Sequence, residues 1–487
     1  MSINPTLPLT HVDTTYIQPT GKIIHVASGQ SLQEALDIAQ PGDTITLDKG
    51  ATYVGNFNLS VKSGSEYIVV TSRDFTNQLR VSPETKMACI VGLGAGPAIY
   101  TSAVAHHYRF IGLEIKSDVG QYNHGLVRFG SGEETTVEQF PHHLILDRCY
   151  VHGDAIAGGK RGVLLSGDYL AVINCHLSDW KGIGQDTQAI CGWTGRGPWK
   201  IKNNYIEGAG ENLMIGGADT HIPDLTPSDI EICGNKFFKP LSWKVGHPDY
   251  SGTPWLIKNL LELKHARRVL IFYNTFENCW RHGQVGFAVT FTVRNQSGTN
   301  PWATVSDVTF IRNDVFNTAN GINMLGYDNE SGVPSQYSKR LLIQHNLFRD
   351  IGTSNEDGIA FQILYGYQDV KIDHNTAIHT GTTIVAEGES FPRFMFSNNI
   401  VQHNLYGIFG SGYGVGNGAI EHYFPGSLIV KNVFKSNESG YESLYPPDNY
   451  FPLTNESIGF VDYPHDLHLS ESSPYYHGTA ENTNIGY

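Results

Sequence analysis

Short stretches of alternating apolar and polar residues follow one another along most of the chain, bounded by Gly, Asn or Asp. Clear examples are LIFYNTF, VTFIRNDVF and LLIQHNLF. Alternation with a period of two is typical of β-strands with one buried face, whereas a helix would place apolar residues three and four positions apart. The pattern therefore predicts a chain built mainly of short strands.

The same short phrase recurs within these stretches: two or three β-forming residues, then Asn, then an aromatic or aliphatic residue. The Asn residues of the phrase are Asn174, Asn203, Asn204, Asn235, Asn274, Asn313, Asn346, Asn375, Asn399 and Asn432. Successive copies lie between 24 residues (Asn375 to Asn399) and 39 residues (Asn274 to Asn313) apart, a spacing typical of solenoids. With two or three strands per repeat, we predict an all-β, right-handed parallel β-helix whose strands pair with their counterparts about 4.8 Å away. Each Asn is expected at a left-handed corner, hydrogen-bonded to its equivalents above and below.

The two ends of the chain read differently from the repeats. Ser31 followed by Glu34 forms a capping box, which predicts an amphipathic helix near residues 31–40 that ends at Pro41 and covers the edge of the first turn. After residue 440 the repeat gives way to a Tyr- and Pro-rich tail. We therefore predict an N-terminal flank at 1–20, one β-helix domain at 21–440, and a tail at 441–487 that covers the last turns.

Composition and charge exclude several classes of protein. Only 16% of the residues are charged and 11% are aromatic, which excludes a disordered chain and a helical bundle. The net charge of −14 argues against nucleic-acid binding, and no apolar run is long enough to span a membrane. The N-terminus lacks the pattern of a signal peptide, so the protein either stays inside the cell or is a mature form or phage product, and we expect a secreted or periplasmic mature form.

Cysteine and histidine spacings give no metal motif. The six cysteines lack CxxC or finger spacing, and we interpret them as small buried apolar residues. The pairs His106–His107 and His142–His143 are interpreted as structural rather than zinc-binding, because no third ligand lies nearby in the sequence.

The segment around residue 264 carries the candidate chemistry. Leu261 and Leu263 face one way, so Glu262 and Lys264 face the other. Aligning successive repeats places Arg294 beside Lys264, and Asn212 falls near the same column. An outward lysine crowded by an arginine loses its proton more easily, as a general base requires.

Cations and aromatic residues are frequent in the same region. The cations are Lys244, Lys258, Lys264, Arg267, Arg268, Arg281, Arg294 and Arg312. We expect them to form a local anion site, or alternatively a salt-bridged face. Trp243, Tyr250, Trp255 and Trp302 lie in long inserts and are expected either to stack on sugar rings or to pack the loops.

The cap helix and the Asn-anchored repeats resemble the right-handed parallel β-helix proteins that act on polysaccharides, over nearly the whole chain. The Lys264, Arg294 and Glu262 arrangement resembles the alginate lyase and chondroitin B lyase family, polysaccharide lyase family six. The resemblance implies β-elimination of an acidic, uronic-acid-containing polysaccharide by a monomer. In it Lys264 would be the base, Arg294 the acid or carboxylate clamp, and Glu262 and Asn212 the Ca²⁺ ligands.

The spacing departs from that family's pattern, because a single Glu262 lies two residues before Lys264. An elimination that uses arginines instead of Ca²⁺ therefore stays open. The substrate-binding residues predicted for either version are Arg267, Arg268, Lys258, Arg281, Trp243, Tyr250 and Trp302.

Two other functions stay open. A glycoside hydrolase on this fold needs two carboxylates, and the candidates are Asp186, Asp219, Asp328, Glu356, Asp357 and Glu387. A non-catalytic carbohydrate-binding or tailspike-like adhesin would need neither a base nor a carboxylate pair.

Overall fold

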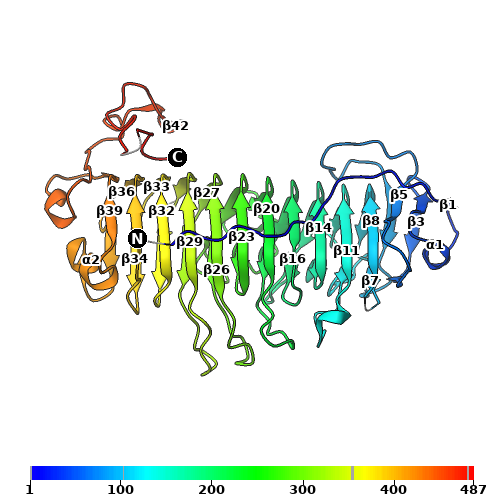
Figure 1. Ribbon diagram of the computed structural model, residues 1–487. Helices are drawn as coiled ribbons and strands as arrows, with labels where there is room; N and C mark the ends of the chain where they lie inside the picture. Colours follow the sequence, from blue (N-terminus) through cyan, green and yellow to red (C-terminus); the bar gives the residue numbers. More distant parts are fainter. Residues whose placement is uncertain (1–2, 103, 353–355, 480–481) are drawn as a thin grey trace. The chain divides into compact units, whose positions relative to one another are not determined.

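The computed structural model describes residues 3–102, 104–352, 356–479 and 482–487. The chain divides into two compact units. The N-terminal unit comprises residues 8–261 and 296–302, and the C-terminal unit comprises residues 1–7, 262–295 and 303–487. In each unit three parallel sheets follow one another along the chain, so that one turn, or rung, of three strands repeats many times (Figure 1). The predicted right-handed parallel β-helix is confirmed.

The N-terminal unit begins its three sheets with short strands that lengthen along the chain. Its first sheet contains β1 (Ile23–Val26), β2 (Thr44–Leu47), β5 (Ile68–Ser72), β8 (His106–Ile111), β11 (His142–Asp147), β14 (Asp168–Ile173), β17 (Trp199–Lys202) and β20 (Ser228–Cys233). Its second sheet contains β4 (Phe57–Leu59), β7 (Ile99–Thr101), β10 (Val127–Phe129), β13 (Arg161–Leu165), β16 (Gln188–Gly192) and β19 (Glu211–Ile215). Its third sheet contains β3 (Thr52–Val54), β6 (Ala88–Val91), β9 (Leu113–Lys116), β12 (Tyr150–His152), β15 (His176–Trp180), β18 (Tyr205–Gly208) and β21 (Lys236–Phe238).

The C-terminal unit continues the same strand order. Its first sheet contains β23 (Ala266–Phe272), β26 (Val305–Ile311), β29 (Lys339–Gln344), β32 (Gln368–Asp373), β35 (Met395–Ser397) and β39 (Leu428–Val430). Its second sheet contains β22 (Leu261–Leu263), β25 (Phe287–Thr292), β28 (Asn320–Leu325), β31 (Phe361–Leu364), β34 (Ile384–Glu387), β37 (Ile408–Gly410) and the antiparallel β38 (Gly414–Val415). Its third sheet contains β24 (Thr275–Cys279), β27 (Asp314–Thr318), β30 (Leu347–Ile351), β33 (Thr376–His379), β36 (Ile400–Gln402) and β40 (Val433–Lys435).

Stacks of identical or similar apolar side chains fill the interior of each unit. In the C-terminal unit Phe310 pairs with Ile343, Ile343 with Ile372, and Ile372 with Phe396 on successive rungs, and all four are buried. Burial of such side chains is the main favourable term in folding, at about 25 cal/mol per Å² of apolar surface. The stack also fixes the register, because a one-residue slip would turn these side chains outward.

The recurring Asn forms a buried ladder, with one correction to its predicted position. In the C-terminal unit the Asn375 side chain donates to the Asn399 Oδ1 at 3.0 Å and accepts from the Asn346 amide nitrogens at 2.9–3.0 Å. Asn174 (φ 56°) and Asn203 (φ 54°) take the predicted left-handed conformation. At the buried ladder Asn residues the left-handed residue is instead the one before the Asn, for example His345 (φ 52°) and His374 (φ 52°). The ladder Asn is buried because it must satisfy the backbone of the adjacent corner, whereas its predecessor makes the turn.

The N-terminal end carries the predicted cap helix. Helix α1 (Leu32–Ile38) buries Leu32, Ala35 and Leu36, and the Ser31 side chain accepts a hydrogen bond from the Glu34 N–H. The predicted helix is therefore confirmed, and it ends two residues earlier than expected.

The flanking residues before the helix lie against the first sheet. In the C-terminal unit the N–H groups of Ile3 and Thr6 donate to Asp369 and Asp307, at 3.2 and 2.9 Å. Asp307 and Asp369 are two rungs apart, and three extended residues span the same distance of about 9.6 Å. The spacing of the flank therefore matches the spacing of the rungs.

The C-terminal residues fold back on the third sheet of their own unit. Helix α2 (Asn417–Tyr423) follows β38, and a hairpin of β41 (Phe460–Asp462) and β42 (Asp466–Leu469) follows the last rung. Ile458, Leu469 and Ile485 pack on Ile400 and Val433. All six cysteines are buried and free, as predicted. In the described part of the chain no helix is long and apolar enough to cross a bilayer.

Candidate functional site on the second sheet

The second sheet of the C-terminal unit brings Lys264 and Arg294 together. Lys264 follows β22 and Arg294 follows β25, and these strands are neighbours in the sheet. The Arg294 backbone N–H donates to the Lys264 carbonyl oxygen at 2.9 Å. The two residues, 30 positions apart in the sequence, therefore lie close together on adjacent rungs, offset by one position in register.

Lys264 lies beside a buried carboxylate. Its Nζ is 3.7 Å from Glu262 Oε2, and the exposed fractions of the two side chains are 14% and 4%. The alternation predicted for β22 is correct, because Leu261 and Leu263 are fully buried on the opposite face. The Lys264 ammonium group is therefore largely enclosed but keeps part of its surface open to a bound ligand.

Arg294 is held by two carboxylates of very different exposure. Its Nη1 donates to the buried Asp328 at 3.1 Å and lies 2.7 Å from Glu330, which is 77% exposed. Asp328 also accepts from the Asn295 backbone N–H at 2.8 Å, so this carboxylate fixes the loop that carries Arg294. Glu330 is free to move into solvent, and a substrate carboxylate can take its place on the guanidinium.

Outward polar atoms next to this pair have no hydrogen-bond partner among the described residues. Thr290 on β25 pairs in register with Asn323 on β28, and both Thr290 Oγ1 and Asn323 Oδ1 are buried and unsatisfied there. Buried polar atoms without partners are rare in folded proteins.

Three tyrosines extend the surface away from Arg294. Tyr327 precedes Asp328, and its ring centroid lies 5.0 Å from that of Tyr337 and 6.2 Å from that of Tyr365. Tyr337 and Tyr365 are 40% and 42% exposed. Because Tyr327 and Tyr365 follow the ends of β28 and β31, the repeats Gly-Tyr-Asp and Tyr-Gly-Tyr were the signal in the sequence that could have found them. Exposed aromatic rings at this spacing can stack on sugar rings.

The predicted Ca²⁺ ligands do not fit a calcium site. Asn212, in the N-terminal unit, is fully buried, and its Oδ1 accepts a hydrogen bond from the Lys239 ammonium at 2.9 Å. Its amide nitrogen donates to the carbonyls of Ile206 and Phe238. An oxygen already bound to a cation is a poor ligand for Ca²⁺, and Glu262 has Lys264 as its cation. The version of the chemistry without metal is therefore the one that these residues fit.

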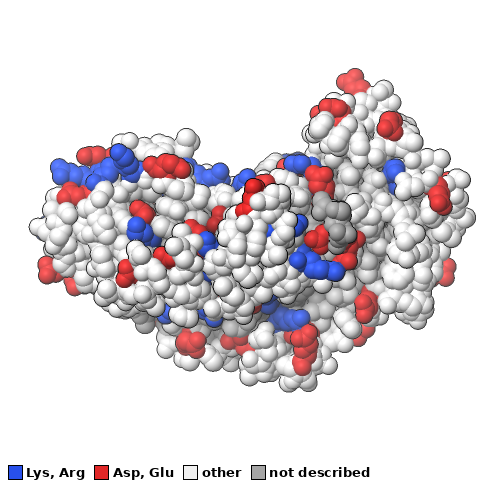
Figure 2. All heavy atoms as spheres, turned by 180° about the vertical axis from the view of Figure 1, so that it is seen from behind, with Lys and Arg blue, Asp and Glu red and all other residues white. Residues whose placement is uncertain are grey.

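The cations of the C-terminal unit do not form a single anion site. Arg267 and Arg268 lie on β23 of the first sheet, and Arg281 pairs with Asp357 on a loop. Arg312 lies at the corner between the first and third sheets. These faces differ from the one that carries Lys264, because the chain turns a corner after every strand. On the side of the molecule seen in Figure 2, basic and acidic side chains are interspersed.

The predicted binding residues of the N-terminal unit are mostly enclosed. Lys258 is buried, with its Nζ 2.6 Å from Glu211 and 2.9 Å from Asp186. Trp243 is 4% exposed, and the Lys181 ammonium lies 5.5 Å from its ring centroid. Loop packing, the alternative left open for Trp243, is therefore what the structure shows.

Of the other three loop aromatics, Trp255 is buried, and Tyr250 and Trp302 are half-buried. The Trp302 indole N–H donates to the Leu225 carbonyl at 3.0 Å, so this N–H is already used in a hydrogen bond within the protein. Tyr250 lies next to Ser251, whose hydroxyl and N–H bind the Ser242 carbonyl and close the loop.

The carboxylates predicted for a hydrolase also have other roles. Asp219 accepts from the N–H groups of Gln296, Ser297 and Thr299 and so shapes a loop of the N-terminal unit. Asp186 pairs with Lys258, as described above. In the C-terminal unit, Asp328 holds Arg294 and Asp357 binds Arg281. Glu387, at the end of β34, is exposed.

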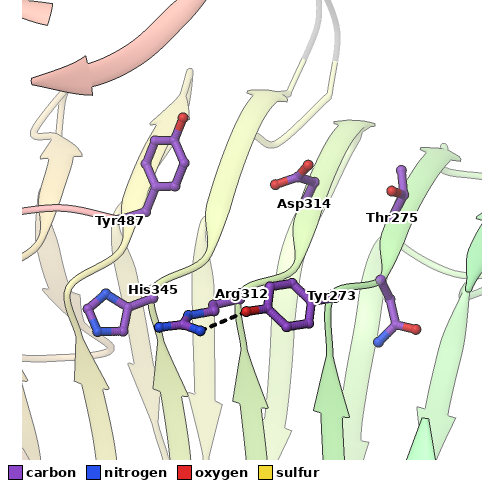
Figure 3. Close-up of a pocket in the computed structure, with 7 residues that line it drawn as sticks. Tyr273, Thr275, Arg312, Asp314, His345 and Tyr487 are labelled. Carbon is purple, nitrogen blue, oxygen red and sulfur yellow. Dashed lines mark hydrogen bonds between the residues drawn. The ribbon is translucent and has the colours of Figure 1, made fainter. Parts of the chain in front are cut away.

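Apart from the surface around Lys264 and Arg294, the C-terminal unit has a polar cavity of about 440 Å³ at the corner between its first and third sheets. It is lined by Tyr273, Asn274, Thr275, Arg312, Asp314, His345 and Tyr487 (Figure 3). The Arg312 Nη1 donates to the Tyr273 hydroxyl at 2.7 Å. Burial raises the pKa of Asp314 and raises that of Tyr487 to about 12, while burial and the nearby His374 lower the pKa of His345. The repeat pattern gave no sign of this cavity, because Tyr487, which lies outside the repeats, forms part of its lining.

A buried carboxyl group in the N-terminal unit has a strongly shifted pKa. Burial, and then the neighbouring Asp179 carboxylate, raise the pKa of Glu207 to about 7. The Glu207 side chain accepts from the Asp179 N–H at 3.1 Å and from the Tyr205 hydroxyl at 3.1 Å. The Lys181 ammonium binds Asp179 at 2.6 Å. Glu207 is too enclosed to reach a polymer, and its titration instead affects folding.

We expect the stability of the wild-type protein to fall relative to that of Glu207→Gln as the pH rises. The folded-state pKa of Glu207 lies above the ordinary Glu value near 4.5, so the folded state holds the proton more tightly than the unfolded state. The stabilisation is complete below about pH 4.5 and is lost as the pH passes 7, with a total of at most ~3 kcal/mol. Denaturant unfolding of both proteins across this range measures the difference. A constant difference, or one that grows with pH, would contradict the shift.

Comparisons with known proteins support the fold. No model of a protein family matches the sequence, and a search among curated proteins finds no match. Among solved structures, a mannuronic-acid-specific polysaccharide family 6 lyase from the human gut microbiota matches with 13% identity and a TM-score of 0.53, over 88% of this chain and 91% of that chain. The family 6 alginate lyase AlyGC matches with 13% identity and a TM-score of 0.51, over 87% and 53%. A GH87 α-1,3-glucanase from Streptomyces thermodiastaticus matches with 12% identity and a TM-score of 0.52, over 91% and 69%. Identities this low establish the shared parallel β-helix alone.

Proposed function

We propose that the protein is a polysaccharide lyase that cleaves an acidic, uronic-acid-containing polysaccharide by β-elimination. Lys264 is the base, and Arg294 binds the uronate carboxylate and supports the departing oxygen. The single observation that supports the proposal is the contact between adjacent rungs, in which the Arg294 N–H donates to the Lys264 carbonyl while both side chains stay partly exposed, at 29% and 14%. The names of the similar structures, two polysaccharide lyases and a glucanase, support a polysaccharide as the substrate.

The residues on this face match the steps of an elimination. The carbon–hydrogen bond α to the carboxylate breaks, and its proton passes to the Lys264 amine. The electron pair forms a carbon–carbon double bond as the bond to the 4-linked oxygen breaks. That oxygen takes a proton from solvent water, and the Lys264 ammonium then returns its extra proton to the solvent. Negative charge grows on the carboxylate during the first step, and a guanidinium held by Asp328 is a rigid donor that stabilises it. Thr290, Asn323 and the three tyrosines supply hydrogen bonds and stacking for the neighbouring sugars.

Product analysis tests this proposal against its alternatives. The purified protein is incubated separately with polymannuronate, polyguluronate, polygalacturonate and chondroitin, and ultraviolet absorbance and reducing ends are recorded together. A lyase produces an unsaturated, ultraviolet-absorbing end with each new reducing end, whereas a hydrolase produces reducing ends alone. An adhesin binds without releasing either product. Reducing ends without absorbance would contradict the proposal.

Replacing Arg294 by Lys should lower kcat/KM by roughly 10- to 100-fold. A lysine keeps the charge and loses the two-pronged contact with a carboxylate, which is worth about 1.5–3 kcal/mol for a charge-assisted hydrogen bond. Initial rates on the best polyuronate measure the effect. Arg349→Lys is the matched control, because Arg349 is also a partly exposed, ion-paired arginine and lies on the third sheet beside Asp350. Equal losses in both variants would contradict the role of Arg294.

A further inference from the structure

Two His-His dipeptides lie side by side in the N-terminal unit. His106 and His107 begin β8, and His142 and His143 begin β11. The strands pair in register at His142 and His106. Each dipeptide by itself lacks a third ligand, and the winding of the chain brings the second dipeptide next to the first.

The backbone points all four rings toward the same region. His107 and His143 have φ values of 56° and 54°, so each interrupts the usual alternation of side chains along its strand. All four residues are half-buried. Within each dipeptide the two Nδ1 atoms are 2.8 Å apart, and between rungs the rings stack at centroid distances of 4.7 Å and 4.5 Å. The result is a block of four imidazoles.

We propose that His107, His142 and His143 form a binding site for a divalent transition-metal ion. One ring nitrogen from each of these three residues lies within 4.8 Å of the other two. With metal–nitrogen bonds of about 2.0–2.1 Å, two nitrogens are about 2.9 Å apart at adjacent corners of a square and about 3.4 Å apart in a tetrahedron. The 2.8 Å separation of Nδ1 atoms within each dipeptide is close to the square arrangement, which Cu²⁺ and Ni²⁺ favour with nitrogen ligands.

The contacts between the rings and their partial burial favour neutral imidazoles over charged ones. Burial, followed by repulsion from the neighbouring imidazoles, lowers the pKa of His107 and of His143 to about 4. Burial also lowers the pKa of His142. Neutral rings offer lone pairs, and in each dipeptide the proton shared between the Nδ1 atoms can move to the outer nitrogen of its ring.

The surroundings leave an entry path for the ion. His143 lines a cavity of about 430 Å³ together with Tyr67, Arg109 and Tyr169. The nearby Arg109 cation is compensated, because its guanidinium binds the Asp147 carboxylate at 2.7 Å. The Tyr169 ring stacks on His143 at 4.5 Å and holds it in place. An ion bound here would tie together two adjacent rungs.

Metal titration of the full-length protein tests the site. After treatment with a chelator, the protein is titrated with NiCl₂, CuCl₂ and ZnCl₂, and with CaCl₂ as a hard-ion comparison, by calorimetry. We expect about one transition-metal ion per chain at this site, no comparable binding of Ca²⁺, and a higher melting temperature of the loaded protein. The His107→Gln/His143→Gln variant should bind the ion roughly 100-fold more weakly or worse, because it lacks two of three ligands.

Two controls keep the test decisive. His124→Gln/His221→Gln removes two exposed histidines of the same unit, and it should bind the ion as the wild type does. Should the first variant fail to fold, electron paramagnetic resonance of the Cu²⁺-loaded wild type provides an independent reading. Coupling of the copper to at least three nitrogens is expected. Coupling to fewer nitrogens, or equal binding by both double variants, would overturn the proposal.

Discussion

Lys264→Arg is expected to lower the rate of unsaturated-product formation by roughly 10²- to 10⁴-fold, the usual contribution of a general base. Arginine keeps the positive charge beside the buried Glu262 but does not give up its proton at neutral pH. The variant therefore separates the proposed proton transfer from the structural role of the ion pair. Lys264→Ala should lose the activity as well, and in addition it leaves Glu262 buried without its cation, so a loss of stability would accompany it.

The control for Lys264→Arg is a variant in which a lysine far from the candidate site is replaced. Lys339→Arg on β29 changes an exposed lysine of the first sheet and should leave the rate unchanged. Circular dichroism of each variant checks that the β-helix is intact. Full activity in Lys264→Arg would show that the base is elsewhere, and the His345 and Arg312 cavity would be the next place to examine by His345→Ala.

Asn375→Ala is expected to lower the free energy of unfolding by about 3 kcal/mol or more. The Asn375 side chain is fully buried, donates to the Ile343 carbonyl and to Asn399 Oδ1, and accepts from Asn346. Removing it leaves several buried polar groups without partners, at about 1–3 kcal/mol for each group left unsatisfied. Denaturant unfolding of the variant and the wild type measures the difference.

An exposed asparagine provides the reference for the ladder. Asn329→Ala, on a surface loop of the same unit, should change the free energy of unfolding by less than about 0.5 kcal/mol. Similar effects in both variants would mean that the Asn ladder adds little to the stability of the β-helix.

Much of the fold could be predicted because each part of the repeat is specified by residues close together in the sequence. Alternating residues, the periodic Asn and the Ser31 capping box each specify a strand, a corner or a helix over a few positions. The place of the Asn within the corner could not be predicted, because the residue before it takes the left-handed conformation whatever its type, as His345, His374 and Lys431 do.

The arrangement of the candidate site could be predicted in part. The repeat indicates which residues lie on adjacent rungs, but it does not indicate on which of the three sheets each residue lies. Aligning the rungs was enough to place Arg294 beside Lys264. The alignment could not show that Arg267 lies on another sheet, since only a few residues separate one sheet from the next. The alignment also did not show that two carboxylates, Asp328 and Glu330, bind the Arg294 guanidinium, because both belong to the following rung.

The four histidines His106, His107, His142 and His143 also show that contacts between rungs are hard to predict from the local sequence. The sequence analysis considered each His-His dipeptide only with its neighbours in the sequence. The other dipeptide, which supplies the further ligands, lies 36 residues away, since His106 pairs with His142. Long inserts within the rungs make that distance irregular, so spacing rules for metal ligands do not apply to it.

Digestion of a polyuronate in water enriched in the heavy oxygen isotope tests the account most directly. Elimination breaks the carbon–oxygen bond without adding water, so mass spectrometry of the fragments made by the wild-type protein should show a double bond at one end and no heavy oxygen taken up during cleavage. The Lys264→Arg protein should yield almost none of these fragments. Fragments that carry one heavy oxygen and no double bond would contradict the account, because they would show that water attacks the bond and that the fold carries a hydrolase.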